Sequence, residues 1–187
     1  MEKSVMKILF TNDEIIKMCK KIGQEITQDY KDTNPIVVCV LKGAKPFHSE
    51  LVKHIKIDFE TDELRVKSYE GTKSKGSIDF LQDLSLNVNN RNIILVEDII
   101  DSGITMNELV PILENRGALS VRVATLLDKQ CNRKVEFSAD YIGAVIPNHF
   151  VIGFGLDFNE KFRELPFIGI YDEDFNTTNK INEKFSE

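Results

Sequence analysis

The chain has 187 residues, of which 42% are hydrophobic, so one core can bury most of its apolar surface and a second domain is not required. It carries 24 Lys and Arg against 30 Asp and Glu, and the net charge of -6 disfavours nucleic acids and anionic membranes as partners. Charges interrupt the first residues, and no stretch approaches the ~20 apolar residues of a membrane span, so we expect a cytoplasmic protein.

The cysteines give no sign of a disulfide framework or a zinc site. Cys19, Cys39 and Cys131 are far apart in the chain and lack CxxC spacing. They stand in apolar stretches, so we expect reduced, partly buried thiols.

The first third of the chain predicts a helix, a buried strand and a second helix. Thr11 and Glu14 have the spacing of a capping box, and an amphipathic pattern continues to about Tyr30. The apolar run 36–41 is typical of a parallel strand buried on both faces, and residues 44–55 resume a helical pattern.

A half-exposed strand and a loop are expected next. Leu64, Val66 and Ser68 alternate with charged or polar neighbours, which indicates a strand with one solvated face. The segment SYEGTKSKGSID, residues 68–79, has two glycines, two lysines and little apolar content, so we predict a mobile loop there.

Strands and helices alternate further along, so the fold class is α/β. A second buried strand is predicted at 93–96, followed by an acidic loop and by a helix over 106–116 that Pro111 should kink and Gly117 should end. We expect the polar tail 176–187 to be frayed. The remaining predicted strands are 121–127, 141–146, 151–154 and 167–171.

The segment IILVEDIIDSGIT, residues 93–105, carries the clearest chemical signal. Glu97, Asp98 and Asp101 follow an apolar strand, and ligands of open α/β sheets bind beyond the carboxyl ends of the strands. Ser102-Gly103 and Thr105 precede a helix and could direct N–H groups and hydroxyls toward one phosphate. The GxxxxGK[ST] spacing is missing, so we do not expect a nucleoside triphosphate held in that manner.

The acidic pair suits a sugar phosphate only with a cation present. Glu97 and Asp98 are suitable acceptors for the cis-diol of a ribose, but carboxylates repel a polyphosphate by about 1 kcal/mol per charge pair at 4 Å in water. Mg²⁺ fits because it binds few carboxylates and keeps water and phosphate oxygens as its other ligands. Taken alone, such a pair is more often an exposed loop charge, and the following SGxT favours the phosphosugar site.

The stretch VEDIIDSGITM closely resembles the phosphoribosyl pyrophosphate motif of phosphoribosyltransferases, in the form of the hypoxanthine-guanine branch. The resemblance implies one domain over 1–187 with a type I phosphoribosyltransferase-like fold, which is a twisted, mainly parallel sheet flanked by helices. It also implies a small hood from about 1–12 and 147–175, and a mobile lid at about 68–79.

Other segments extend the resemblance along most of the chain. Leu41-Lys42-Gly43-Ala44 is similar to the family's pyrophosphate loop, in which the peptide before the lysine is often cis. Ser68-Tyr69 resembles the Ser-Tyr pair of the lid, and 126–129 matches the segment whose lysine contacts the purine 6-oxo group. Phe150-Val151 falls where an aromatic ring stacks on the base and a backbone pairs with it, and 155–163 is similar to the closing segment.

The resemblance implies transfer of 5-phosphoribosyl from phosphoribosyl pyrophosphate to N9 of hypoxanthine, and of guanine, with pyrophosphate released. Asp101 is then the candidate general base at N7, and Lys129 would steady the 6-oxo group. Mg²⁺ would lie near Glu97, Asp98 and Asp157. The implied substrate contacts are Leu41, Lys42, Gly43, Ser68, Tyr69, Glu97, Asp98, Ile99, Ile100, Ser102, Gly103, Ile104, Thr105, Lys129, Phe150, Val151, Asp157 and Arg163.

Some positions depart from the family pattern or have ordinary alternatives. Ile104 stands where a polar or basic residue is common, and Asn148-His149 replace a frequent Asp-Lys pair. Without the resemblance, Phe150 would be read as a core residue, and Lys129 and Arg163 as solvated charges. The histidines have no metal-ligand spacing, so no catalytic part is expected of them.

Two other functions are possible for a chain with this motif. A non-catalytic regulator that senses phosphoribosyl pyrophosphate and binds nucleic acid could share the fold, but no basic face is visible in the sequence. An enzyme for xanthine, adenine or a pyrimidine is the other alternative, and adenine is disfavoured because Lys129 and a 6-amino group would both donate. The family resemblance implies a homodimer or homotetramer.

Overall fold

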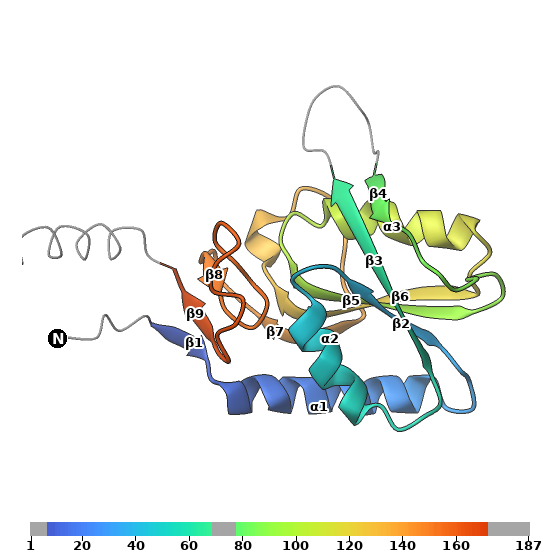
Figure 1. Ribbon diagram of the computed structural model, residues 1–187, viewed down its shortest axis with the longest axis horizontal. Helices are drawn as coiled ribbons and strands as arrows, with labels where there is room; N and C mark the ends of the chain where they lie inside the picture. Colours follow the sequence, from blue (N-terminus) through green and yellow to red (C-terminus); the bar gives the residue numbers. More distant parts are fainter. Residues whose placement is uncertain (1–6, 69–77, 172–187) are drawn as a thin grey trace, which may run out of the picture.

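The computed structural model describes residues 7–68 and 78–171, and its centre is a six-stranded sheet in the order β4-β3-β2-β5-β6-β7 (Figure 1). All neighbouring strands in it are parallel except β3 and β4, which are antiparallel. The prediction of a mainly parallel α/β sheet is therefore confirmed. The strands are β2 (Ile36–Val40), β3 (Glu60–Ser68), β4 (Ile78–Gln82), β5 (Asn92–Ile100), β6 (Ser120–Asp128) and β7 (Tyr141–Val145).

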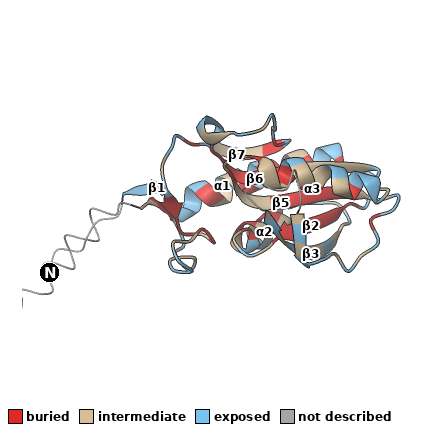
Figure 2. Cartoon of the chain, turned by 90° about the horizontal axis from the view of Figure 1, so that it is seen from above, coloured by how far each residue is buried: buried red, intermediate tan, exposed pale blue. Residues whose placement is uncertain are grey.

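Helices cover both faces of this sheet, which explains why its central strands are continuously apolar. One face packs against α1 (Asn12–Asp29) and α2 (Lys45–Leu51), and the other against α3 (Ile104–Asn115). Successive residues of β5 enter opposite cores, because Ile94 and Val96 belong to the cluster with α1 whereas Ile93 and Leu95 belong to the cluster with α3. Figure 2 shows the buried strands between partly exposed helices.

A second, three-stranded sheet joins the start of the chain to its last described part. Its order is β1-β9-β8, and both pairs are antiparallel. The strands are β1 (Ile8–Phe10), β8 (Val151–Ile152) and β9 (Ile168–Ile170). Asn12 Nδ2 also donates to Pro166 O over 2.9 Å. All three strands fall within the segments that were expected to form the hood. The bounds of the hood stay a prediction, because residues 1–6 and 172–175 lie outside the described residues.

The local prediction at the start of the first helix is confirmed. Thr11 N donates to Glu14 Oε2 over 2.8 Å, and Glu14 N donates to Thr11 Oγ1 over 3.4 Å, which completes the capping box. The second helix is shorter than expected, because a 3-10 turn, η1 (Val52–His54), follows Leu51. The predicted kink at Pro111 stays a prediction, and Pro111 lies inside α3.

The acidic segment was wrongly predicted to be a loop. β5 continues to Ile100, because its residues pair with β6, for example Glu97 with Thr125. The predicted strand 151–154 is also too long, since Gly153 and Phe154 have positive φ values of 96 and 49 degrees and leave the extended conformation.

The predicted loop 68–79 was partly wrong. Ser68 pairs with Ile78, so both ends of this segment belong to the β3-β4 ladder. The rest of the predicted lid, 69–77, and the polar tail lie outside the described residues.

The described cysteines are all free, with Cys19 and Cys39 buried and Cys131 exposed. Within residues 7–68 and 78–171, no helix is both long and apolar enough to cross a bilayer.

Candidate active site

The loops that follow β2 and β8 meet the carboxyl end of β5. A Cβ atom on Gly43 would lie 1.8 Å from Asp98 Oδ2, so no other residue fits there unless the Asp98 carboxylate moves. A Cβ atom on Gly155 would lie 2.0 Å from Gly43 O, and Gly155 has a φ of 97 degrees. Three segments that are distant in sequence therefore touch at one place.

A turn over residues 41–44 follows β2. The Leu41–Lys42 peptide is cis, and Leu41 N still donates to Leu64 O over 2.8 Å. Lys42 Nζ lies 3.1 Å from Glu160 Oε2, which links this loop to the one after β8.

The adjacent acids at the end of β5, Glu97 and Asp98, repel each other when both are charged, and a cation would relieve this repulsion. Burial raises the pKa of Glu97 well above its usual range, and the neighbouring Asp98 charge raises it further. Burial also raises the pKa of Asp98, although hydrogen bonds from Ile99 N and the positive charge of Arg163 partly oppose this. A positive charge placed beside this pair would be stabilised.

Asp157 and Arg163 form an ion pair at the other side of the same site. Arg163 Nη2 lies 2.8 Å from Asp157 Oδ1, and Arg163 Nη1 donates to Gly155 O over 2.7 Å. The second oxygen of Asp157 accepts from Glu160 N over 2.8 Å. The buried Nε of Arg163 has no hydrogen-bond partner among the described residues.

Asp101 and Lys129 form a second ion pair, in which only one of the two carboxylate oxygens of Asp101 is used. Lys129 Nζ donates to Asp101 Oδ2 over 3.1 Å, and Lys129 is only 6% exposed, so its reading as a solvated surface charge is wrong. Asp101 Oδ1 is buried and has no partner within the described part of the chain. Lys129 N donates to Ile100 O over 2.9 Å, which holds the two segments together.

The turn after β5 leads directly into α3. Gly103 precedes the helix with a φ of 80 degrees, and Ile104 N donates to Ser102 Oγ over 3.4 Å. A cavity opens at this turn, and its lining residues are Glu97, Ile99, Ile100, Asp101, Ser102, Gly103, Thr105 and Met106. The predicted phosphate cradle is therefore next to Asp101, and Ile104 is absent from the lining.

Phe150 presents its ring to a neighbouring cavity. It is 51% exposed, which is unlike the core residue that its type alone suggests. Phe158 and Tyr171 pack against this ring in edge-to-face arrangements, each with a centroid separation of 5.8 Å, and Val151 pairs with Ile170 in the second sheet. The lining of this cavity is Asp98, Ile99, Asp101, Lys129, Phe150, Val151, Leu156 and Asp157.

The four predicted acids thus share two cavities, but they do not form a ready-made metal cage. Asp98, Asp101 and Asp157 line one cavity, and Glu97 lines the other together with Asp101. Among the residues that the structure describes, no group of three or more His, Cys, Asp or Glu side chains is arranged to hold a metal ion. A cation bound here would need further ligands from the bound substrate.

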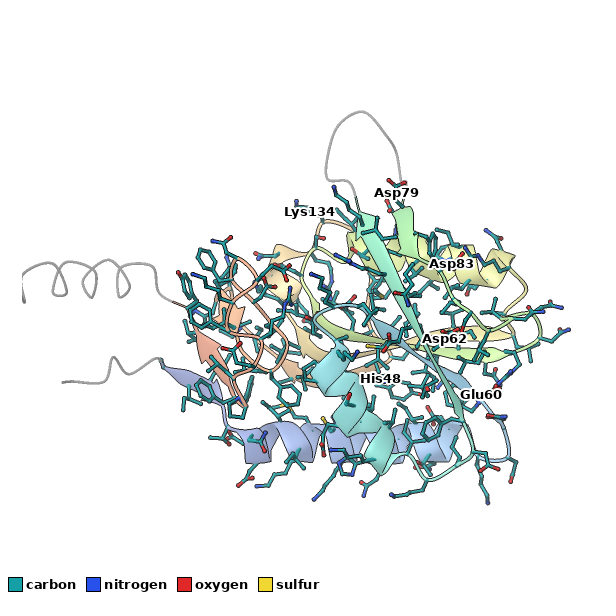
Figure 3. All side chains as sticks on the ribbon, viewed as in Figure 1. His48, Glu60, Asp62, Asp79, Asp83 and Lys134 are labelled. Atoms are coloured by element: carbon teal, nitrogen blue, oxygen red, sulfur yellow. The ribbon has the colours of Figure 1, made fainter. Side chains whose placement is uncertain are left out.

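The two predicted lid residues cannot be placed at this site, and the histidines were given no part in it. Tyr69 lies outside the described residues, and Ser68 is placed only through its backbone in β3. His48, labelled in Figure 3, lies on α2 with Nε2 3.3 Å from Val37 O, and burial lowers its pKa.

Two residues near the site were missed in the sequence. Asp128 is fully buried at the end of β6 and forms an ion pair with Arg133. A charged residue at the end of the apolar run before Lys129 was the available signal, because a buried carboxylate needs a partner.

Comparisons with known proteins show which proteins this chain is similar to. The model of the phosphoribosyl transferase domain matches residues 6–159. The hypoxanthine-guanine phosphoribosyltransferase of Streptococcus thermophilus is 46% identical over 175 residues, which cover 93% of this chain and 97% of the relative.

Solved structures of phosphoribosyltransferases are also similar to this chain. A hypoxanthine phosphoribosyltransferase from Staphylococcus aureus superposes with a TM-score of 0.85 at 35% identity, covering 97% of this chain and 94% of that one. A hypoxanthine-guanine phosphoribosyltransferase from Bacillus anthracis gives a TM-score of 0.83 at 36% identity, covering 88% and 96%.

Proposed function

The chain belongs to the phosphoribosyl transferase domain family, and from this premise we propose that it is a purine-salvage enzyme. It transfers 5-phosphoribosyl from phosphoribosyl pyrophosphate to N9 of hypoxanthine, and of guanine, and releases pyrophosphate. The proposal rests on one cavity, which is lined by the Asp101–Lys129 pair and by the exposed Phe150. A flat 6-oxopurine fits between an aromatic ring and polar groups that address its edge.

Asp101 is the proposed general base. Asp101 lines the cavity of Phe150, and its Oδ1 has no hydrogen-bond partner among the described residues, so the carboxylate has capacity to accept the proton from N7 while N9 bonds to the anomeric carbon. Lys129 holds the other carboxylate oxygen and donates toward the 6-oxo group, so the purine is oriented as its proton leaves. A 6-amino group would offer Lys129 no acceptor, which disfavours adenine.

Magnesium fits the acids at the end of β5 if it arrives with phosphoribosyl pyrophosphate. Burial and mutual repulsion raise the pKa of Glu97, so this pair favours an added positive charge. Mg²⁺ is commonly bound through one or two carboxylates plus substrate oxygens, so a three-ligand cage is not needed. Glu97, Asp98 and Asp157 are the proposed ligands or diol acceptors, and the ion would supply neutralisation of phosphate charge.

The leaving pyrophosphate is assigned to the loops that meet at Gly43. Lys42 and Arg163 are the cations there, and each is paired with an acid of the loop after β8. These pairs would exchange their carboxylate partners for phosphate oxygens, which suit both cations. The predicted lid at about 68–79 would exclude water from the oxocarbenium-like centre.

A nucleic-acid-binding regulator on the same fold receives no support. The net charge of -6 opposes it, and the relatives reported above carry the names of enzymes. We further propose a cytoplasmic homodimer or homotetramer.

The direct test is a spectrophotometric assay with phosphoribosyl pyrophosphate and Mg²⁺. Hypoxanthine, guanine, xanthine and adenine are offered in turn, and we expect turnover with hypoxanthine and guanine and little with adenine. Preference for adenine would contradict the role given to Lys129. Binding of RNA or duplex DNA without turnover of any base would favour the regulator.

A further inference from the structure

Arg133 lies behind the turn that leads from β5 to α3, on segment 129–134. Its Nη1 donates to Asp101 O over 2.7 Å and to Ile100 O over 3.2 Å, and its Nε donates to Phe137 O over 3.1 Å. A Cβ atom on Gly103 would lie 2.9 Å from Arg133 Cδ, so the side chain also packs directly against the turn.

Asp128 fixes the guanidinium in this position. Arg133 Nη2 pairs with Asp128 Oδ1, and Gln130 Nε2 donates to Asp128 Oδ2 over 2.9 Å. The side chains of Arg133 and Asp128 are 14% and 1% exposed, so neither is free to turn into solvent. The rigid fork of an Arg side chain suits such a fixed set of acceptors, whereas a Lys side chain cannot serve them together.

Successive carbonyls of the turn are held by the same segment. Ile100 O accepts from Lys129 N over 2.9 Å, Asp101 O accepts from Arg133, and Ser102 O accepts from Lys134 N over 2.9 Å. In a planar trans peptide the C=O and the next N–H point in opposite directions. The N–H groups of Ser102 and Gly103 are therefore turned away from segment 129–134.

Consecutive N–H groups turned to one side form an anion-binding concavity. Ser102, Gly103 and Thr105 line the cavity at this turn, next to the start of α3. We propose that Arg133, held by Asp128, is a positioning residue that orients the backbone of this turn for the 5′-phosphate of the substrate. This inference rests on the proposed function and adds a residue to its machinery.

The position of Arg133 also couples the phosphate site to the base site. The same guanidinium holds the carbonyl of Asp101, the proposed general base, and is paired with Asp128, which directly precedes Lys129. Loss of the Arg133 guanidinium would lower the affinity for the phosphate most, because in the proposed complex the N–H groups of the turn bind the phosphate directly. The base site would be affected less, because Lys129 keeps its own hydrogen bond to Asp101.

The test is an Arg133→Lys variant, which retains the positive charge opposite Asp128. We expect the KM for phosphoribosyl pyrophosphate to rise about tenfold, the cost of about one hydrogen bond, while the KM for hypoxanthine changes little. Calorimetry with ribose 5-phosphate alone should show a similar loss of affinity, and it requires no purine chemistry. Methylguanidinium should partly restore an Arg133→Ala variant.

Arg116→Lys is the matched control. Arg116 makes a two-pronged ion pair with Asp83, with distances of 2.7 and 2.9 Å, but it caps the carboxyl end of α3, at the opposite end of the helix from Gly103. Both KM values should equal those of the wild type in this variant. If Arg133→Lys fails to fold, the double variant Asp128→Asn/Arg133→Gln removes both charges of the pair and should show the same selective rise in KM.

The outcomes separate this inference from the proposed function. A wild-type protein that turns over no purine base would contradict the proposed function, and ribose 5-phosphate binding would still test Arg133. Unchanged ribose 5-phosphate affinity and unchanged KM in a folded Arg133→Lys protein would overturn the inference. A fall in kcat alone, with both KM values kept and no rescue by methylguanidinium, would also overturn it, because it would indicate a purely structural ion pair.

Discussion

At the residue scale, the site depends on how a few charges are paired before any substrate binds. Lys129 is almost fully buried and is held by one oxygen of Asp101, whose other oxygen has no partner in the part of the chain that the structure describes. Buried polar atoms without a partner are costly, so such an atom beside a cavity is expected where a bound ligand completes the hydrogen bonds. The purine is that ligand in the proposed mechanism.

Replacing Asp101 by Asn tests the proposed general base. The amide keeps the shape of the side chain but cannot accept the N7 proton, so kcat should fall by about 10²- to 10⁴-fold. Steady-state kinetics with saturating phosphoribosyl pyrophosphate measure this, and binding of the sugar phosphate should persist. A variant that keeps the full rate with every base would show that Asp101 is not the base.

Replacing Lys129 by Ala tests recognition of the 6-oxo group. The variant loses one charge-assisted hydrogen bond, so the KM for hypoxanthine should rise about tenfold or more. The KM for phosphoribosyl pyrophosphate should change much less, because Lys129 lines the cavity of Phe150 and not the one at the turn. Equal weakening for both substrates would contradict this role.

The thiols provide a test of burial at the same scale. Burial raises the pKa of Cys19 and of Cys39 to about 12, whereas Cys131 is exposed. At about pH 8 a thiol reagent should therefore modify one cysteine of the native protein quickly and the other two only after unfolding.

Because the fold favours the protonated thiols, their contribution to stability is complete below the usual thiol pKa and is lost as the pH rises toward 12. Rapid reaction of all three thiols would contradict the buried core.

At the element scale, the sequence predicted regular structure best where the hydrophobic pattern is strong. The capping box at Thr11 and the apolar run of β2 were both recognised because local residues determine them. Strands β1 and β4 were not predicted, since each pairs with a distant or partly polar segment. The strand character of Glu97 and Asp98 was likewise missed, because it depends on pairing with β6.

Gly43→Ala tests the contact between elements at the site. The new Cβ would meet the Asp98 carboxylate and push it from its place, so kcat/KM for phosphoribosyl pyrophosphate should fall at least about tenfold. Gly117→Ala is the control, because Gly117 has a φ of 93 degrees and faces the side chain of Asn89 after α3. It should lower the melting temperature and leave the kinetics unchanged. Wild-type kinetics for Gly43→Ala would argue against this contact in the active enzyme.

At the scale of the whole molecule, the site forms where two sheets meet. The loop after β2 belongs to the large sheet, and Gly155 follows β8 of the small one, so their contact joins the two parts (Figure 1). The family motif predicted which segments gather here. The ion pairs of Arg133 with Asp128 and of Lys42 with Glu160 could not be predicted from it, since side-chain partners depend on the packing of distant loops.

In the proposed complex these segments surround one substrate pair, with the sugar diphosphate at the acids and the purine at Phe150. A crystal structure with Mg²⁺, hypoxanthine and an unreactive analogue of phosphoribosyl pyrophosphate tests it most directly. We expect the base between Phe150 and the Asp101–Lys129 pair, and the phosphates beside Asp98, Gly43 and the turn at Ser102. A ligand bound elsewhere, with the Asp101–Lys129 cavity empty, would show that this is not the active site.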